Sequence, residues 1–145
     1  MEKGSRKLEN KIRTMELKSI VSISKLSAKD LFRKLSVVKN FEKIMPNNIS
    51  KFDVLSSDSF IFGIKGMPTF QLKIIEKIES EKIILKSLES KIDFYLEGYI
   101  KEVNDKNTQF HIEFKGQLNP MMEIMVKTPL QTFINDLSKN IANLN

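Results

Sequence analysis

The residues best able to carry out chemistry fall on two predicted strands in the second half of the chain. His111 is the single histidine, and Glu97 and Glu113 are the closest pair of carboxylates by strand position. A histidine can serve as a general base or metal ligand, and two carboxylates can divide acid and base roles. Strand alternation, however, puts all three side chains on the polar face of the predicted sheet. We therefore expect an exposed histidine beside Tyr99 and Lys101, and neither a catalytic triad, a metal site nor a glycosidase-type pair.

Other polar positions give weaker indications. Glu76 and Ser87 fall near strand ends, where either side chain could face the interior and orient a polar group of a ligand. Gly63 and Gly66 lie on a strand and its turn, whereas a phosphate-binding glycine loop leads into a helix. The chain has no cysteine, which excludes disulfides, thiolate metal sites and a cysteine nucleophile. The sequence therefore predicts no catalytic residue, no metal and no cofactor.

Composition and charge are those of an ordinary globular domain. A chain of 145 residues, 41% of them hydrophobic and 29% charged, can bury one core. It has no secretory signal pattern and no apolar run of about 18 residues, so we expect a cytoplasmic protein without a membrane span. The net charge of +6 comes from 24 basic and 18 acidic residues, and the basic residues are mostly lysines spread along the whole chain. We interpret them as solvated faces and expect no specific nucleic-acid binding.

The N-terminal part of the chain is expected to hold one strand and two short helices. Residues 1–14 are polar and charged, which predicts a flexible extension ahead of a single domain at 15–145. A strand is predicted over residues 17–26. Ser27 then opens a short helix with a pattern that resembles a capping box, and a second helical piece covers residues 40–45.

Six further strands are predicted from the alternation of apolar and polar residues. The simplest arrangement is an antiparallel meander with one apolar face and one wet face. The strands are separated by turn signals at residues 56–59, 66–68, 79–81, 89–91 and 104–107.

The loop between the last two strands decides which charged residues face each other. The inward residues of both strands are even-numbered, so the loop should contain three or five residues. A loop of three would place Glu97 opposite Glu113, whereas a loop of five would place Glu97 opposite Lys115. We favour five residues, because opposite charges attract across a strand pair.

The last third of the chain predicts one long amphipathic helix. Asn119 is a good N-cap and Pro120 suits the first helical position. Apolar residues then recur at three- and four-residue spacing as far as Leu144. A helix with such a stripe must cover the apolar face of its own sheet. Pro129 removes a backbone bond to Met125 and should kink the helix, and we favour a static kink over a mobile lid.

Two segments are similar to parts of known proteins. Their residues are Ser27-Ala28, Leu31-Phe32 and Asn40-Phe41 in the first segment, then Leu118-Asn119-Pro120-Met121-Met122 with Lys127, Pro129-Leu130-Gln131 and Phe133 in the second. The order of elements over residues 17–144 resembles the helix-grip fold of the START and birch-pollen-allergen (SRPBCC) superfamily. The resemblance implies an α+β fold, in which a curved antiparallel sheet of about seven strands wraps around a long C-terminal helix. It points to small bacterial members of the polyketide-cyclase and lipid-transport type.

This resemblance implies a cavity between the sheet and the C-terminal helix. The cavity would bind a small apolar ligand, such as a lipid, an isoprenoid quinone or a polyketide-like molecule. From the residues alone, a completely filled core is an equal alternative. Gly98 and Gly116, on inward positions of adjacent strands, would allow sheet curvature or leave space. The expected walls are Phe62, Ile64, Phe70, Leu72, Leu85, Phe94, Leu96, Phe110, Ile112, Phe114, Met121, Met122, Met125 and Phe133.

Two other functions stay open at this point. A cyclase or dehydratase-type enzyme would use the same cavity, but it needs an ionisable group there and the predicted walls supply almost none. A ribosome or protein interaction module of the ribosome-association-toxin type would have a filled core and a clustered positive patch. We expect a binding protein rather than an enzyme, and a monomer or weak homodimer.

Overall fold

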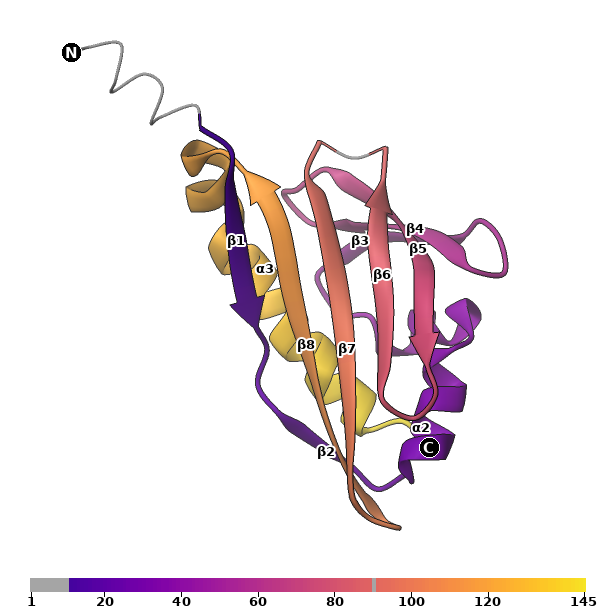
Figure 1. Ribbon diagram of the computed structural model, residues 1–145. Helices are drawn as coiled ribbons and strands as arrows, with labels where there is room; N and C mark the ends of the chain where they lie inside the picture. The colour runs from indigo at the N-terminus through magenta and orange to yellow at the C-terminus, as the bar shows by residue number, and fades with distance from the viewer. Residues whose placement is uncertain (1–10, 90) are drawn as a thin grey trace, which may run out of the picture.

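A computed structural model of the protein describes residues 11–89 and 91–145. Its elements form one curved sheet, a long C-terminal helix and two short helical segments (Figure 1). In chain order they are β1 (Arg13–Lys18), β2 (Ser22–Ser24), α2 (Ala28–Leu35), the 3-10 helix η1 (Val38–Ile44), β3 (Ile49–Val54), β4 (Ser59–Ile64), β5 (Thr69–Ile78), β6 (Lys82–Leu88), β7 (Asp93–Asn104), β8 (Asn107–Leu118) and α3 (Pro120–Ala142).

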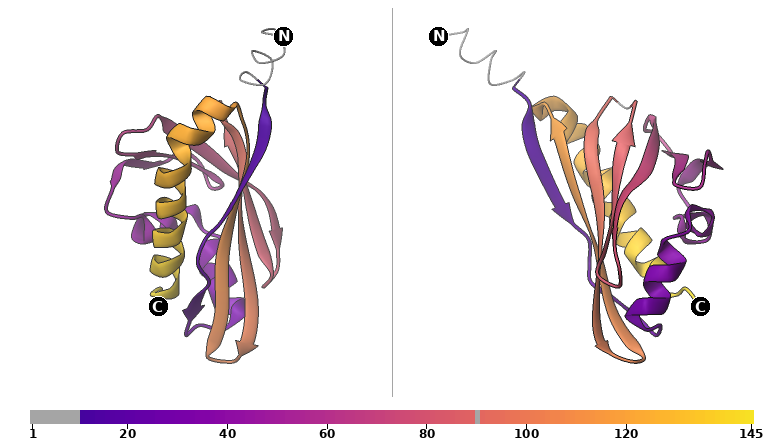
Figure 2. Two further views of the ribbon diagram at one scale, coloured as in Figure 1. Left: turned by 90° about the vertical axis from the view of Figure 1, so that its left-hand side faces the viewer. Right: turned by 45° about the vertical axis from the view of Figure 1, so that its right-hand side comes forward.

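The sheet has the strand order β1-β8-β7-β6-β5-β4-β3, with every neighbouring pair antiparallel. It curves around α3, which lies along its concave face (Figure 2). The helix α2 contacts β6 and β7, and η1 contacts α3 and β3. This is the helix-grip α+β architecture that the order of elements predicts. Within the described ranges, no helix combines the length and apolar character needed to cross a bilayer.

The starts of the two α-helices, α2 and α3, follow from their capping residues. The Ser27 hydroxyl accepts a hydrogen bond from the backbone N–H of Asp30 at 3.1 Å and opens α2. The Asn119 side chain accepts from the N–H of Met122 at 2.8 Å, with Pro120 next in the first turn of α3. The helix continues through Pro129, and its first turns lean away from the axis of the remainder (Figure 2, left). The local sequence therefore determines where α2 and α3 begin.

The first strand differs from its prediction. It begins at Arg13, inside the expected extension, and it is divided into β1 and β2, which both pair with β8. Three residues separate Lys18 from Ser22, whereas two residues separate their β8 partners Glu113 and Phe110, so one residue is extra. Ser19 occupies this irregularity, and its hydroxyl accepts from the N–H of Ile112 at 2.8 Å. The part of the expected extension at residues 1–10 lies outside the described residues.

The predicted five-residue loop between β7 and β8 is wrong. The hairpin closes with Asn104 opposite Asn107, and an irregularity between Glu102 and Asn104 adds one unpaired residue. Because of this bulge, the inward residues of both strands remain even-numbered although the turn is shorter than five residues. As a result, Glu97 lies opposite Glu113 and not opposite Lys115.

Candidate functional site

The candidate site is a cavity of about 60 Å³ enclosed between the sheet, η1 and the C-terminal half of α3. It lies in the main hydrophobic core, where every residue that lines it is aliphatic, aromatic, methionine or glycine. The lining residues are Leu35, Phe41, Ile44, Met45, Phe60, Phe62, Leu72, Ile83, Leu85, Leu96, Gly98, Ile100, Phe110, Ile112, Phe133, Leu137 and Ile141.

Half of the residues expected in the cavity wall are found there. These are Phe62, Leu72, Leu85, Leu96, Phe110, Ile112 and Phe133. Four others are buried in the surrounding core without lining the space, namely Ile64, Phe70, Phe94 and Phe114. Met122 packs against the core, whereas Met121 and Met125 are exposed to solvent and do not line the cavity. The wall is therefore built by the C-terminal half of α3 and not by its methionine-rich start.

Sequence reasoning missed the contribution of the two short helical segments. Leu35 from α2 and Phe41, Ile44 and Met45 from or beside η1 close the side of the cavity. For α3, the sequence did contain a signal for the wall, because Phe133 is followed at helical spacing by two further lining residues, Leu137 and Ile141. For η1, the sequence contained no such signal, because only the tertiary packing of that segment shows which space it covers.

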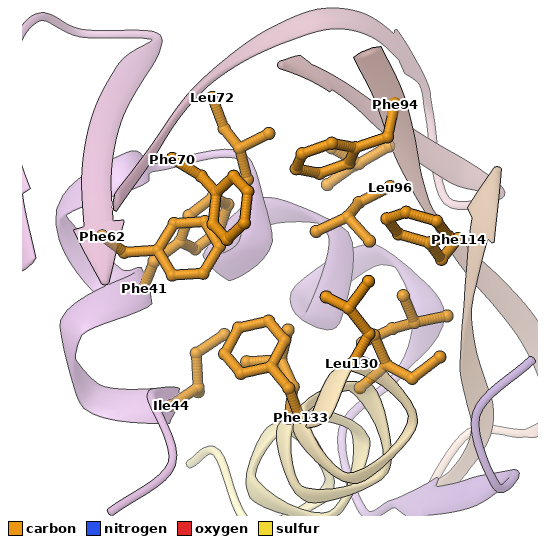
Figure 3. Packing of buried hydrophobic residues seen from close by; sticks show 14 of the residues in the cluster. Phe41, Ile44, Phe62, Phe70, Leu72, Phe94, Leu96, Phe114, Leu130 and Phe133 are labelled. Atoms are coloured by element: carbon orange, nitrogen blue, oxygen red, sulfur yellow. The ribbon is translucent and has the colours of Figure 1, made fainter. Parts of the chain in front are cut away.

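Aromatic rings account for the small volume of the cavity. A Cβ atom placed on Gly98 would come within 3.1 Å of the Phe110 ring, and one on Gly116 within 2.7 Å of the Phe114 ring. The space above both glycines is therefore occupied by rings from β8. Phe62 of β4 stacks on Phe133 of α3 at a ring-centroid distance of 5.2 Å, which joins the sheet to the helix (Figure 3).

Neither polar residue that was a candidate for an inward position is available to a ligand. Glu76 is exposed, because an irregularity between Ile74 and Glu76 turns its side chain to the outer face of the sheet. Ser87 is buried, but its hydroxyl donates to the carbonyl of Ile92 at 3.1 Å and accepts from the N–H of Phe94 at 2.9 Å. Ser87 therefore serves the turn between β6 and β7.

The histidine and the carboxylate pair form a closed network on the outer face of the sheet. His111 stacks on Tyr99 with ring centroids 5.0 Å apart and hydrogen-bonds Glu113 through Nε2 at 2.9 Å. The Tyr99 hydroxyl donates to Glu97 at 2.5 Å, and Lys115 Nζ lies 2.9 Å from the same carboxylate oxygen. This network faces away from the cavity, as strand alternation predicts. His111 is half-buried there rather than fully exposed.

The network shifts the protonation of its members. Partial burial raises the pKa of Glu97, but hydrogen bonds from Tyr99 and Lys115 outweigh burial and leave that pKa below its ordinary value. Burial and the hydrogen bond to Glu97 raise the pKa of Tyr99 to about 12. The hydrogen bond to Glu97 also raises the pKa of Lys115. All three pKa shifts favour an ionised Glu97 that accepts hydrogen bonds from a neutral Tyr99 hydroxyl and a charged Lys115, and none of them produces a free base or acid. Among the described side chains, no group of three or more histidine, aspartate or glutamate residues converges to hold a metal ion.

Comparison with known proteins identifies the architecture. No protein-family model matches the chain, and no curated protein sequence matches it. Solved structures do match in shape. Norcoclaurine synthase from Thalictrum flavum has a TM-score of 0.68 at 11% sequence identity, covering 94% of this chain and 91% of that chain.

Two bacterial structures support the same assignment. A START superfamily protein from Mycobacterium smegmatis has a TM-score of 0.64 at 11% identity, covering 90% of this chain and 99% of that chain. The Zhui aromatase/cyclase from Streptomyces has a TM-score of 0.62 at 12% identity, covering 87% and 92%. At such low identity the likeness concerns the fold alone. The protein thus has the START-like (SRPBCC) helix-grip fold.

Proposed function

We propose that the protein binds or carries a small hydrophobic ligand, a lipid, an isoprenoid quinone or a polyketide-like molecule, in the cavity between its sheet and α3. The observation that carries this proposal is an unfilled space with entirely apolar walls at the centre of the fold. A structural neighbour, norcoclaurine synthase, has been solved in complex with dopamine and hydroxybenzaldehyde. We further propose that the protein acts in the cytoplasm as a monomer or weak homodimer.

The size of the cavity favours a thin ligand and a wall that moves. A volume of about 60 Å³ is well below the roughly 300–1,000 Å³ of most small-molecule sites. The segment best suited to move is η1, because a 3-10 helix has poorer hydrogen-bond geometry than an α-helix and η1 has no side-chain N-cap. Outward movement of Phe41 and Ile44 would widen the space directly beside Phe133 and Ile141.

The apolar lining indicates which part of a ligand is held. With no polar side chain in the wall, binding would come from burial alone, worth about 25 cal/mol per Å² before entropic costs. That chemistry suits a hydrocarbon or isoprenoid chain better than a ring system with several hydroxyl groups. It also gives a cyclase or dehydratase reaction no acid or base, because none of the lining residues is ionisable.

Native mass spectrometry of the protein purified from its natural host tests the proposal. We expect a stoichiometric apolar adduct that is lost on denaturation and recovered by lipid extraction. A Leu137→Phe variant, which fills the cavity, should lose the adduct, whereas Thr132→Phe on the exposed face of α3 should retain it. A clean mass together with no thermal shift across a panel of lipids and quinones would overturn the proposal. That result would favour the interaction-module alternative.

A further inference from the structure

The start of α3 presents an apolar surface that neither the core nor the cavity uses. Met121, Ile124 and Met125 have exposed fractions of 71%, 81% and 69%, and every other large hydrophobic side chain in the described ranges is at most 58% exposed. Spacings of three and four residues put the three side chains on one face of the helix. We name these three residues the apolar end of α3.

The apolar end of α3 lies at one extremity of the molecule. The first turns of α3 and the start of β1 lie next to each other at the same end of the sheet (Figures 1 and 2). An ion pair between Arg13 and Glu123, at 3.5 Å, joins the two segments. Ile12, directly before β1, is 57% exposed and adds a fourth apolar side chain at this end of the molecule. Four exposed apolar side chains therefore gather at this end of the molecule.

The charges beside the apolar end of α3 are mainly positive. Glu123 is the single acidic residue between positions 119 and 135, and Arg13 pairs with it. Lys127 follows Ile124 by three residues, which places it on the adjacent turn, and its side chain is exposed. Lys11 precedes β1 and is also exposed. An apolar group with basic neighbours is complementary to a surface that combines hydrocarbon with negative charge.

Other occupants fit less well. Residues 1–10 contain only two large apolar side chains, Met1 and Leu8, so they offer little to cover three. A second copy would bring like charge, since each chain carries +6. Even an aromatic side chain buries at most about 150–250 Å², so three partly exposed aliphatic ones fall short of the roughly 800 Å² per partner of a stable dimer.

We propose that the apolar end of α3 docks this protein on the surface of an anionic lipid bilayer. Met121, Ile124 and Met125 insert at the boundary between headgroups and acyl chains, and Lys127 contacts the negatively charged headgroups. Unbranched methionine side chains adapt to the irregular packing of that boundary. Docking does not depend on a ligand in the cavity, because none of the three residues lines it. It would bring a carrier of apolar molecules to the place where such molecules reside.

Vesicle flotation tests this inference with the full chain. We expect the protein to float with vesicles of phosphatidylcholine containing about one quarter phosphatidylglycerol, and to bind pure phosphatidylcholine more weakly. The variant Met121→Ser/Ile124→Ser/Met125→Ser should bind at least about tenfold more weakly, because interfacial binding scales with the apolar area inserted. The matched control Val37→Ser/Val54→Ser/Leu55→Ser changes three other exposed apolar residues and should bind like the unmodified protein.

A fluorescence measurement gives an independent readout. The chain has no tryptophan, so Ile124→Trp introduces a single reporter. Its emission should shift to shorter wavelength on addition of the anionic vesicles, and Lys127→Gln or an increase in salt from about 0.1 M to about 1 M should weaken the effect. Equal flotation of the triple serine variant and the unmodified protein would overturn the inference, as would an unshifted emission. Loss of a homodimer in the triple variant, without vesicle binding by the unmodified protein, would also overturn it.

The same variant separates this inference from the proposed function. Ligand retention in the cavity, measured by native mass spectrometry, should be unchanged in the triple serine variant. Vesicle binding without any cavity ligand would contradict only the proposed function. A cavity ligand without vesicle binding would contradict only the docking inference.

Discussion

Glu97 and Glu113 lie directly opposite each other on β7 and β8, and both carboxylates share the ammonium group of Lys115. Its Nζ is 2.9 Å from Glu97 and 3.9 Å from Glu113. Lys115 follows Glu113 by two residues on β8, lies opposite Tyr95, and reaches Glu97 diagonally across the strand pair. The repulsion within the like-charge pair that appears unfavourable in the sequence is therefore reduced by a cation on the same face.

Replacing this lysine should expose the repulsion. We expect Lys115→Gln to reduce the free energy of unfolding by about 1 kcal/mol, since ion pairs near a protein surface contribute at most about that much. Urea denaturation measures the change. Lys101→Gln, on the same outer face, is the control and should change stability by less than about 0.5 kcal/mol. Equal effects of the two substitutions would show that Lys115 does not hold the carboxylates together.

The same network predicts a late tyrosine titration. The pKa of Tyr99 is raised to about 12 by burial and by its hydrogen bond to Glu97. Because the folded-state pKa lies above the unfolded value of about 10, the stabilising contribution is complete below pH of about 10 and is lost as the pH rises through about 12. The chain has two tyrosines, so a Tyr95→Phe variant leaves Tyr99 as the only phenol.

Phenolate absorbance of Tyr95→Phe, followed against pH while the protein remains folded, measures this pKa directly. Adding Glu97→Gln to that variant removes the carboxylate and should lower the midpoint toward about 10. An unchanged midpoint would show that Glu97 is not the cause. At acid pH the dependence of stability on pH has the opposite sign, because the pKa of Glu97 is lowered in the folded state. The stabilisation from Glu97 is present above its unfolded pKa of about 4.3 and is lost as the pH falls through the folded value.

Ser87 makes a further test of the buried polar contacts. Its hydroxyl bonds both the carbonyl of Ile92 and the N–H of Phe94, and Ser87→Ala would leave these two backbone groups without that partner. We expect a loss of about 1–3 kcal/mol in the free energy of unfolding. Ser57→Ala, at an exposed position, should have little effect. A similarly small effect at Ser87 would mean that water can replace its hydroxyl.

Much of the fold could be predicted from local patterns in the sequence. Alternation identified the inward faces of β4 to β8, because apolar residues at every second position of a strand indicate the buried face. Capping residues identified the starts of α2 and α3. The register of β7 and β8 could not be predicted, because a single bulged residue near Glu102 reverses the parity of the loop.

The cavity was harder to predict than the fold. Its wall depends on how far α3 is shifted and rotated on the sheet, which places Leu137 and Ile141 inward and Met121 and Met125 in solvent. The part of the wall from η1 depends on contacts between distant segments. A periodic pattern indicates that a residue is apolar and on one face, but it does not indicate what that face covers.

Phe110 is the residue that most directly limits the cavity. Its ring lines the space and also fills the volume above Gly98 on the adjacent strand. Phe110→Leu should therefore enlarge the cavity and lower the free energy of unfolding by about 1–2 kcal/mol. If the cavity binds apolar chains, the same variant should bind a fluorescent fatty acid more tightly, as measured by titration. Phe94→Leu removes an equally buried ring that does not line the cavity, so it should cost similar stability without improving binding. Equal binding by both variants would show that the fatty acid occupies a different site.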